Sequence, residues 1–326
     1  MKDISIFEAV AFLKENDNFL LFTHASPDGD TLGSALALQL LLEKSQKTAL
    51  ILCPDEIPDR LKFLPRSDKI IHSIPEGKFT LVSIDIASLP MLRGLDEIFL
   101  STLIFDLSID HHCTNTVPCA RRLLFANYSA AGEIIAEMVP EFGYDFDQAL
   151  AFCLYASISS DSGCFKYSST RPKTHMIAAE LLKTGIDFAK INRLLFETKT
   201  VSQLALEREA YNCIELFFDG KVAIACLKEE LFQNGDILES DVDGVNQIPR
   251  QILGVEVSAV IRKKNSEIKV SLRSNDYFDV SLLASSFGGG GHMHAAGCRF
   301  NTSIADAKAK ILYALESEFD GNKRDS

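Results

Sequence analysis

Hydrophobic and polar positions alternate in blocks along the first half of the chain. Short apolar runs bounded by turn residues are typical of buried strands, and the longer segments rich in Ala and Leu between them favour helices. The expected strands are Phe19–Thr23, Thr48–Cys53, Phe79–Ile84 and Leu103–Ile109, and the expected helices span 33–43, 130–139 and 146–159. Because strands that alternate with helices pair in parallel, this half predicts an α/β domain: a parallel sheet with helices on both faces.

The second half has a different pattern. A long helical stretch is expected from Ile186 to Phe218, then strand-like runs at 222–227, 255–261 and 268–272, and a last helix at 304–319. This order predicts a smaller α+β domain. We therefore expect a first domain over residues 1–190, a helical linker over 191–215 and a second domain over 216–326.

Composition narrows the classes of protein. The chain has 326 residues, of which 47% are hydrophobic, enough to bury the cores of two domains. Its net charge of −12 argues against a protein that coats long nucleic acid through a broad basic surface. No apolar run approaches the roughly 20 residues of a membrane-spanning helix. The eight cysteines form no C-x-x-C pair, so free thiols in a reducing cytoplasm are expected.

Candidate chemistry is concentrated where the expected elements end. The residues are His24, Asp28 and Asp30 after the first strand, Asp85 after the third, Asp110, His111 and His112 after the fourth, and Asp161 at or after a helix. A single Asp in such a place is more often a cap or turn residue. The carboxyl ends of parallel strands share one ligand-binding edge, however, so four such segments together indicate one site.

The residue types at this edge favour a pair of metal ions. Carboxylates and imidazoles suit Mn²⁺, Mg²⁺ or Fe²⁺. Without cations the carboxylates of Asp28, Asp30, Asp85 and Asp161 would repel one another, and two divalent ions balance their four charges. Two ions roughly 3.5–4 Å apart, bridged by a carboxylate such as Asp85, activate water and bind phosphoryl oxygens. Hydrolysis of a phosphoester or phosphoanhydride is therefore predicted.

These segments together resemble the DHH phosphoesterase superfamily, whose motifs occur here in the expected order. His-x-x-x-Asp-x-Asp followed by Gly-Ser matches the first motif, Asp85 the second, Asp110-His111-His112 the third and Asp161 the fourth. The resemblance implies two metal sites, one held by His24, Asp28 and Asp85 and the other by Asp30, Asp85, His111 and Asp161. It also implies that Asp110 orients a histidine, that His112 acts beside the phosphate, and that Asn115 contacts substrate.

A second set of motifs lies near the C-terminus. Four glycines from Gly288 to Gly291, followed by His292, resemble the signature of the DHHA1 domain, and consecutive glycines let a backbone approach an anion closely. The resemblance implies that the substrate-binding residues are Arg273, Ser274, Gly289, Gly290, Gly291 and His292. The alternative for the four glycines is a flexible linker, and the alternative for Arg273 is a surface arginine at the end of a strand. Arg262-Lys263-Lys264 is similar to a run in family II pyrophosphatases, but we interpret it as a hairpin turn with solvated charges.

The compact size is similar to that of nanoRNase/pAp phosphatases within the DHHA1 group. This resemblance implies hydrolysis of short oligonucleotides to 5′-mononucleotides and removal of phosphate from 3′-phosphoadenosine 5′-phosphate (pAp). It also implies two bound divalent ions, with Mn²⁺ as the first choice. The alternatives are cleavage of cyclic or linear di-AMP, an inorganic pyrophosphatase, and a non-catalytic nucleotide sensor. Acidic surface would repel long nucleic acid, so short substrates are the expected partners, with no membrane. Homodimer formation stays open.

Overall fold

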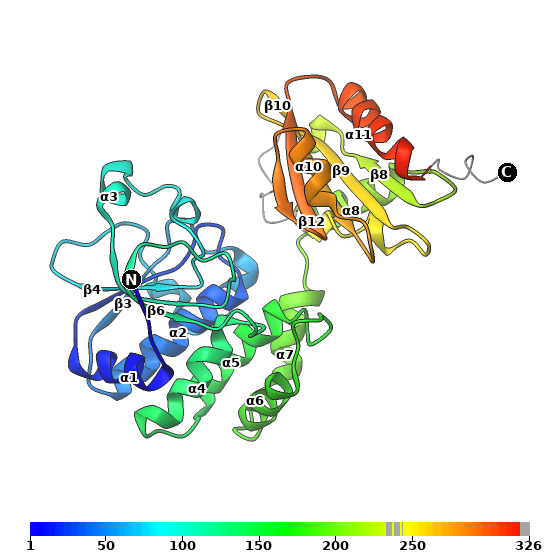
Figure 1. The fold of residues 1–326 in the computed structure, drawn as a ribbon. Coiled ribbons are helices and arrows are strands. Elements are labelled where there is room, and N and C mark those ends of the chain that lie inside the picture. Colours follow the sequence, from blue (N-terminus) through cyan, green and yellow to red (C-terminus); the bar gives the residue numbers. More distant parts are fainter. Residues whose placement is uncertain (233–236, 238–241, 243, 320–326) are drawn as a thin grey trace. The chain divides into compact units, whose positions relative to one another are not determined.

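The structure is a computed structural model that describes residues 1–232, 237, 242 and 244–319 (Figure 1). The chain divides into two compact units, Met1–Thr198 and Lys199–Ser326. Separate clusters of buried hydrophobic side chains lie in each of them.

The first unit is built on a six-stranded sheet in which every neighbouring pair is parallel. Its strands are β1 (Lys2–Asp3), β2 (Phe19–Phe22), β3 (Ala49–Leu52), β4 (Thr80–Ile84), β5 (Phe105–Asp110) and β6 (Cys119–Leu124), in the order β1-β6-β5-β4-β2-β3. The four expected strands and their parallel pairing are confirmed. Strands β1 and β6 escaped the sequence pattern because β1 is a polar dipeptide and β6 carries Arg121 and Arg122.

Helices cover both faces of this sheet, as expected. On one face lie α1 (Ile6–Glu15), α2 (Gly29–Lys44), α4 (Ala131–Phe142) and α5 (Gln148–Asp161), and on the other lie α3 (Glu97–Thr102) and a 3₁₀ turn (Leu89–Leu92). Successive residues of β2 serve the two faces in turn: Phe19 and Leu21 pack in one core, Leu20 and Phe22 in the other. Helices α6 (Pro172–Leu182) and α7 (Phe188–Asn192) complete the unit.

Helix α2 begins earlier than the sequence pattern predicted. Asp28 is its N-cap, and its Oδ1 accepts hydrogen bonds from the backbone N–H groups of Asp30 and Thr31, both at 3.0 Å. Asp30 therefore lies in the first helical turn. In Figure 1, α2 lies between the sheet and α5, and its residues from Gly29 to Gln39 are all buried.

The expected helix from Ile186 to Phe218 is divided, so that prediction was wrong. Helix α7 continues as a π-helical turn (Arg193–Glu197), the backbone becomes extended at Thr198, and α8 (Val201–Asn212) begins after its own N-cap, Thr200. Leu206 and Ala210 of α8 pack in a core of the second unit. The stretch ends in a strand, β7 (Ile214–Phe217).

The second unit is a smaller α+β domain, as expected. Its sheet has the order β11-β12-β10-β9-β8-β7, with β8 (Val222–Cys226), β9 (Val257–Lys264), β10 (Glu267–Ser274), β11 (Gly290–His292) and β12 (Ala295–Phe300). The pair β8–β9 is parallel and the other pairs are antiparallel. Helices α10 (Val280–Ser286) and α11 (Ile304–Phe319) contribute to its larger core. Further 3₁₀ turns of the chain are Asp59–Leu61, Ser67–Lys69, Glu229–Phe232 and Pro249–Gln251.

The basic run at residues 262–264 is not a turn, which corrects the expectation. These residues end β9, and the turn follows them at Asn265, whose φ is 55°. Arg262 is only 3% exposed, with its guanidinium carbon 5.4 Å from the Phe232 ring centroid. Lys263 forms an ion pair of 2.8 Å with Glu229. Arg262 therefore helps to build the second unit's interior.

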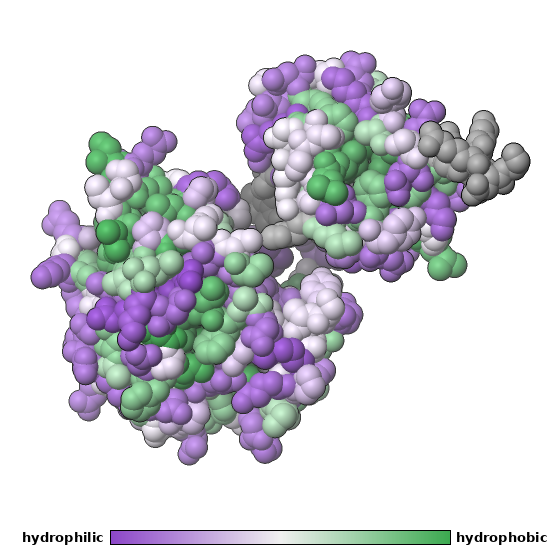
Figure 2. All heavy atoms as spheres, in the orientation of Figure 1, coloured by the Kyte–Doolittle hydropathy of each residue, from purple (hydrophilic) through white to green (hydrophobic). Residues whose placement is uncertain are grey.

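Hydrophilic and hydrophobic residues are interspersed on the face in view in Figure 2, as is usual for a protein surface. None of the helices within the described ranges has the length and apolar character needed to cross a membrane.

Candidate metal centre and active site

The candidate ligands of the first unit meet at the carboxyl edge of its sheet. His24 follows β2, Asp30 lies in the first turn of α2, Asp85 follows β4, His111 follows β5, and Asp161 is the last residue of α5. Their ligand atoms form three groups, each with all its atoms within 4.8 Å of one another: His24, Asp28 and Asp85; Asp30, His111 and Asp161; and Asp85, His111 and His112. The structure thus brings together all six residues predicted as metal ligands.

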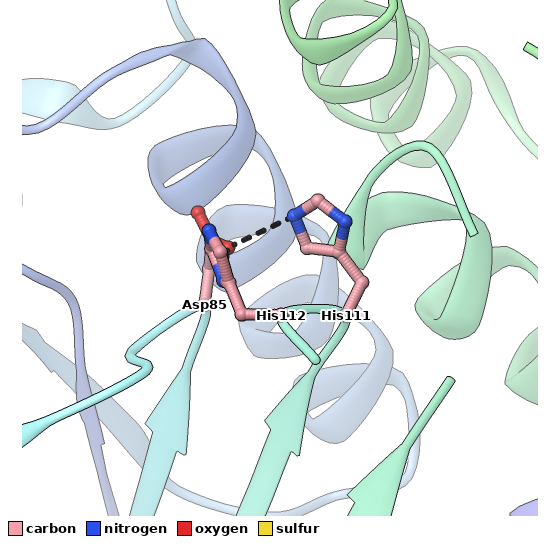
Figure 3. Close-up of side chains that lie close together, drawn as sticks. All are labelled: Asp85, His111 and His112. Atoms are coloured by element: carbon pink, nitrogen blue, oxygen red, sulfur yellow. Dashed lines mark ion pairs between the residues drawn. The ribbon is translucent and has the colours of Figure 1, made fainter. Parts of the chain in front are cut away.

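The carboxylate of Asp85 lies between the side chains of His24 and His111. Its Oδ2 is 3.6 Å from Nε2 of His24, and its Oδ1 is 3.4 Å from Nε2 of His111. Figure 3 shows Asp85 at the end of β4 and His111 and His112 directly after β5. A dashed line marks the ion pair between Asp85 and His111. The φ of Asp85 is 59°, a left-handed conformation that costs energy for most residues and recurs at functional sites.

The surrounding carboxylates raise the pKa values of His24 and His111. Burial disfavours the imidazolium form of His24, but Asp85 and Asp28 outweigh this and raise its pKa to about 10. Burial likewise opposes charge on His111, yet contact with Asp85, Asp30 and Asp161 raises its pKa to about 11. Each ring uses Nδ1 on a backbone carbonyl, that of Ala25 for His24 and that of Tyr128 for His111, so Nε2 of each faces the carboxylates.

Asp30 is fully buried and held from several sides. Its Oδ1 accepts hydrogen bonds from the hydroxyls of Ser34 (2.9 Å) and Ser157 (2.5 Å), and its Oδ2 accepts one from the Ala131 N–H (2.7 Å). Burial and the charge of Asp85 nevertheless raise the pKa of Asp30 to about 7. Burial and the charges of Asp30, Asp28 and Asp85 also raise the pKa of Asp161. The cluster therefore has more negative charge than its own histidines compensate.

Among the described residues, two buried candidate ligand atoms make no hydrogen bond: Oδ1 of Asp85 and Nε2 of His111, which lie 3.4 Å from each other. Such atoms are costly unless something else satisfies them, and a cation would do so for both. Carboxylate oxygens with imidazole nitrogens are suitable ligands for Mn²⁺, Mg²⁺ or Fe²⁺. The donor set and the orphaned atoms therefore fit divalent cations.

Asp110 and His112 form a separate pair beside the cluster. Asp110 is fully buried, and its Oδ1 accepts a hydrogen bond from Nδ1 of His112 at 2.8 Å. Burial opposes charge on His112, but Asp110 and Asp85 raise its pKa. Asn115 donates from Nδ2 to Oδ2 of Asp110 (2.6 Å) and to the Ile86 carbonyl (3.1 Å). This amide nitrogen is thus committed inside the protein, and contact of Asn115 with substrate stays a prediction.

The predicted residues of the second unit lie on β10 and on or just before β11, the two strands that flank β12. Arg273 lies opposite Ala295 on β12, and Ala295 lies opposite His292 on β11. Ser274 is fully buried, and its hydroxyl lies 3.0 Å from Nδ1 of His294. The glycine segment is partly a strand, because Gly290, Gly291 and His292 form β11. Gly289 lies against β12: an added Cβ would be 2.7 Å from Cβ of Cys298, so only glycine fits there.

Sequence reasoning missed three residues near this segment. His294 is one, through its contact with Ser274. Lys269 and Arg299 are the others: they lie opposite each other on β10 and β12, and with Gly288, Gly289 and Gly290 they line a hollow of about 340 Å³. The period of two along β10 puts Lys269 and Arg273 on one face, a signal that the sequence already contained.

Comparisons with known proteins agree with this geometry. A model of the DHHA1 domain matches residues 219–320. A curated relative from Thermus thermophilus, named bifunctional oligoribonuclease and PAP phosphatase NrnA, is 29% identical over 301 residues, covering 91% of this chain and 88% of its own. An exopolyphosphatase-related protein from Bacteroides fragilis is similar in structure, with a TM-score of 0.83, 26% identity and coverage of 97% and 96%. The exonuclease RecJ bound to manganese shares the fold, with a TM-score of 0.55, 13% identity and coverage of 99% and 97%.

The parallel α/β unit with candidate Asp and His ligands at its strand ends has the arrangement expected of a DHH phosphoesterase, and the second unit matches the DHHA1 domain. Over most of its length the chain is similar to proteins named bifunctional oligoribonuclease and PAP phosphatase NrnA, which agrees with the expected resemblance to the DHH/DHHA1 phosphoesterases. The expected family and fold class are confirmed.

Proposed function

We propose that the protein is a metal-dependent phosphoesterase that hydrolyses short oligonucleotides to 5′-mononucleotides and removes the 3′-phosphate of pAp. The observation that carries the proposal is the convergence of three candidate ligand groups, with buried atoms of Asp85 and His111 at their centre that make no hydrogen bond. The relatives that cover most of the chain support this choice of substrates, because several are named oligoribonucleases and PAP phosphatases.

Two divalent ions fit the ligand groups. His24, Asp28 and Asp85 would hold one ion, and Asp30, Asp85, His111 and Asp161 the other, with Asp85 shared. When bound, such ions activate water and neutralise charge on phosphoryl oxygens. Manganese is our first choice, supported by the RecJ structure with manganese and by the mixed carboxylate and imidazole donors.

His112 is the proton-transfer residue of the proposed reaction. Asp110 holds its Nδ1–H, so Nε2 remains for the substrate. The raised pKa of His112 favours the imidazolium form, which can donate from Nε2 to a phosphoryl oxygen or to the departing oxygen. Asn115 in turn holds the other oxygen of Asp110 and keeps this carboxylate in place.

The second unit supplies groups for a terminal phosphate or nucleotide. Arg273, Ser274, Gly289, Gly290, Gly291 and His292 are the proposed contacts. Arginine suits phosphate through its planar fork of N–H donors, and glycine backbone can approach an anion closely. The net charge of the whole chain, −12, opposes binding of long nucleic acid, so we propose short substrates only. The eight free cysteines support a reducing compartment such as the cytoplasm.

A panel of substrates tests the proposal directly. Purified protein with Mn²⁺ is incubated in parallel with pApA, pAp, cyclic di-AMP, inorganic pyrophosphate and a 24-nucleotide RNA, and the products are separated by chromatography. We expect AMP from both pApA and pAp, little cleavage of the long RNA, and loss of all turnover with excess chelator. Preferred cleavage of cyclic di-AMP or pyrophosphate would replace the proposed substrate class, and tight binding without turnover would indicate a nucleotide sensor.

A further inference from the structure

The segment Tyr128–Gly132 holds two candidate metal ligands that come from other elements. The carbonyl of Tyr128 accepts a hydrogen bond from Nδ1 of His111 at 3.1 Å. The N–H groups of Ala131 and Gly132 donate to Asp30, at 2.7 Å to Oδ2 and 3.2 Å to Oδ1. One short stretch of backbone therefore sets both the tautomer of His111 and the orientation of Asp30.

This segment is fastened by a buried carboxylate. Glu133, in the first turn of α4, is fully buried. Its Oε1 accepts hydrogen bonds from the hydroxyls of Ser129, at 2.5 Å, and of Thr174, and its Oε2 accepts one from Nη2 of Arg171, at 2.5 Å. Since a buried charge is costly unless it is paired, and all these partners converge on it, Glu133 ties the segment firmly to the start of α6.

Arg171 connects the same carboxylate to Tyr128. Its guanidinium carbon lies 4.0 Å from the centroid of the Tyr128 ring, a stacked cation–π contact. The phenol of Tyr128 donates to Glu137 at 3.0 Å, which holds the far end of the ring. Arg171 itself is fixed as the N-cap of α6, with its N–H donating to the Thr174 hydroxyl at 3.1 Å. The side chain of Tyr128 is thus held while its carbonyl orients His111.

We propose that Glu133 and Arg171 form a clamp that positions His111 and Asp30 for metal binding, without touching the ions or the substrate. The inference rests on the proposed metal centre. It assigns a function to two charged residues that lie outside every ligand group. The clamp acts through the backbone of Tyr128–Gly132, so its loss should weaken metal binding before it affects the chemistry.

The test measures Mn²⁺ binding to the substrate-free protein, from free Mn²⁺ by electron paramagnetic resonance. Arg171→Met should raise the Mn²⁺ dissociation constant by about 10–100-fold, the usual effect of losing a residue that orients a ligand. Arg171→Lys keeps the positive charge but lacks the planar guanidinium that stacks on Tyr128, and should raise the Mn²⁺ dissociation constant by less. At saturating Mn²⁺, kcat of Arg171→Met should return to within a few-fold of the original, because the ions then fill the site.

Two controls separate positioning from stability. Arg66→Met breaks an Arg–Glu ion pair of 2.5 Å elsewhere in this unit and should leave Mn²⁺ affinity unchanged. Ile177→Ala removes packing from α6 beside the clamp and should lower the melting temperature, with Mn²⁺ affinity unchanged. If Ile177→Ala weakens Mn²⁺ binding as much as Arg171→Met does at equal loss of melting temperature, the clamp is only structural and the inference is wrong.

A double variant covers the case in which Arg171→Met leaves Glu133 charged and prevents folding. Glu133→Gln with Arg171→Met removes both charges and preserves the volumes of the side chains, so it should fold and still bind Mn²⁺ weakly. A folded double variant with unchanged Mn²⁺ affinity would overturn the clamp. Absence of Mn²⁺ binding by the unaltered protein would instead overturn the metal centre of the proposed function, so the two failures differ.

Discussion

At the scale of single residues, Asp85 combines a left-handed backbone conformation with a place in two of the three candidate ligand groups. The left-handed conformation costs less for Asp and Asn than for most residues, so Asn is the suitable replacement. Asp85→Asn retains the shape but removes the charge that faces both His24 and His111. We expect kcat/KM for pAp to fall by more than the ~10–100-fold that accompanies loss of an orienting residue, because a shared ligand serves both ions.

The matched control for this change lies at the other end of a neighbouring strand. Asp106→Asn on β5 alters a half-buried carboxylate that accepts a hydrogen bond from the Leu81 N–H at 2.9 Å. Its kcat/KM with Mn²⁺ should stay within a few-fold of the original. Near-normal turnover by Asp85→Asn would show that the assignment of two ions around this residue is wrong.

The candidate ligands could be picked out of the sequence because each has a local signature. An Asp or His that directly follows a strand is visible in the sequence, and parallel pairing brings such residues to one edge. The residues that orient them have no such signature. Glu133 sits in an ordinary first helical turn and Arg171 precedes a proline, and their connection to His111 exists only because α4 and α6 start side by side. Asn115 was predicted to contact substrate, which stays a prediction, and the sequence did not reveal that its amide nitrogen donates to Asp110.

At the scale of elements, the site depends on how closely α5 approaches α2. Gly29 and Gly33 lie one turn apart on α2 and face α5. A Cβ on Gly29 would be 2.7 Å from Cβ of Ser160, and a Cβ on Gly33 would be 2.6 Å from the carbonyl oxygen of Cys153. This approach brings Asp161, at the end of α5, to Asp30 at the start of α2.

Gly33→Ala should therefore destabilise the first unit, although Ala is the better helix former. The added methyl meets backbone, which cannot rotate away, and overpacking of this kind costs about 1–3 kcal/mol. Urea unfolding followed by circular dichroism measures the loss. Gly244→Ala is the control, since Gly244 is helical and a Cβ there would meet none of the described atoms within 4 Å, and it should be neutral or slightly stabilising. A Gly33→Ala protein of unchanged stability would contradict the close approach of the helices.

The elements that escaped sequence reasoning did so for two physical reasons. Strand β6 pairs between β1 and β5 and is polar enough to hide its period, so only its partners reveal it. The interruption between α7 and α8 follows from the extended backbone of Thr198, together with a capping box formed by Thr200 and Gln203. That capping pair was present in the sequence as a helix-start signal within an otherwise helical composition.

At the scale of the whole molecule, the two units have separate cores, and the candidate metal ligands found among the described residues lie in the first unit. A ligand stabilises the part of a protein that binds it, by about 2.7 kcal/mol at a concentration of 100 times its dissociation constant. We therefore expect calorimetry of the full chain to show two unfolding transitions, of which Mn²⁺ raises one and leaves the other in place.

A core substitution assigns the transitions. Leu272 is fully buried in the core of the second unit, so Leu272→Ala should destabilise that unit by about 2–5 kcal/mol and lower the transition that Mn²⁺ does not move. Leu36→Ala, in the first unit's core, should lower the other transition, and excess Mn²⁺ should restore part of the loss. If Mn²⁺ shifts the same transition that Leu272→Ala lowers, the ions bind outside the first unit or the units unfold together, and the metal centre at the strand ends of β2, β4 and β5 loses its support.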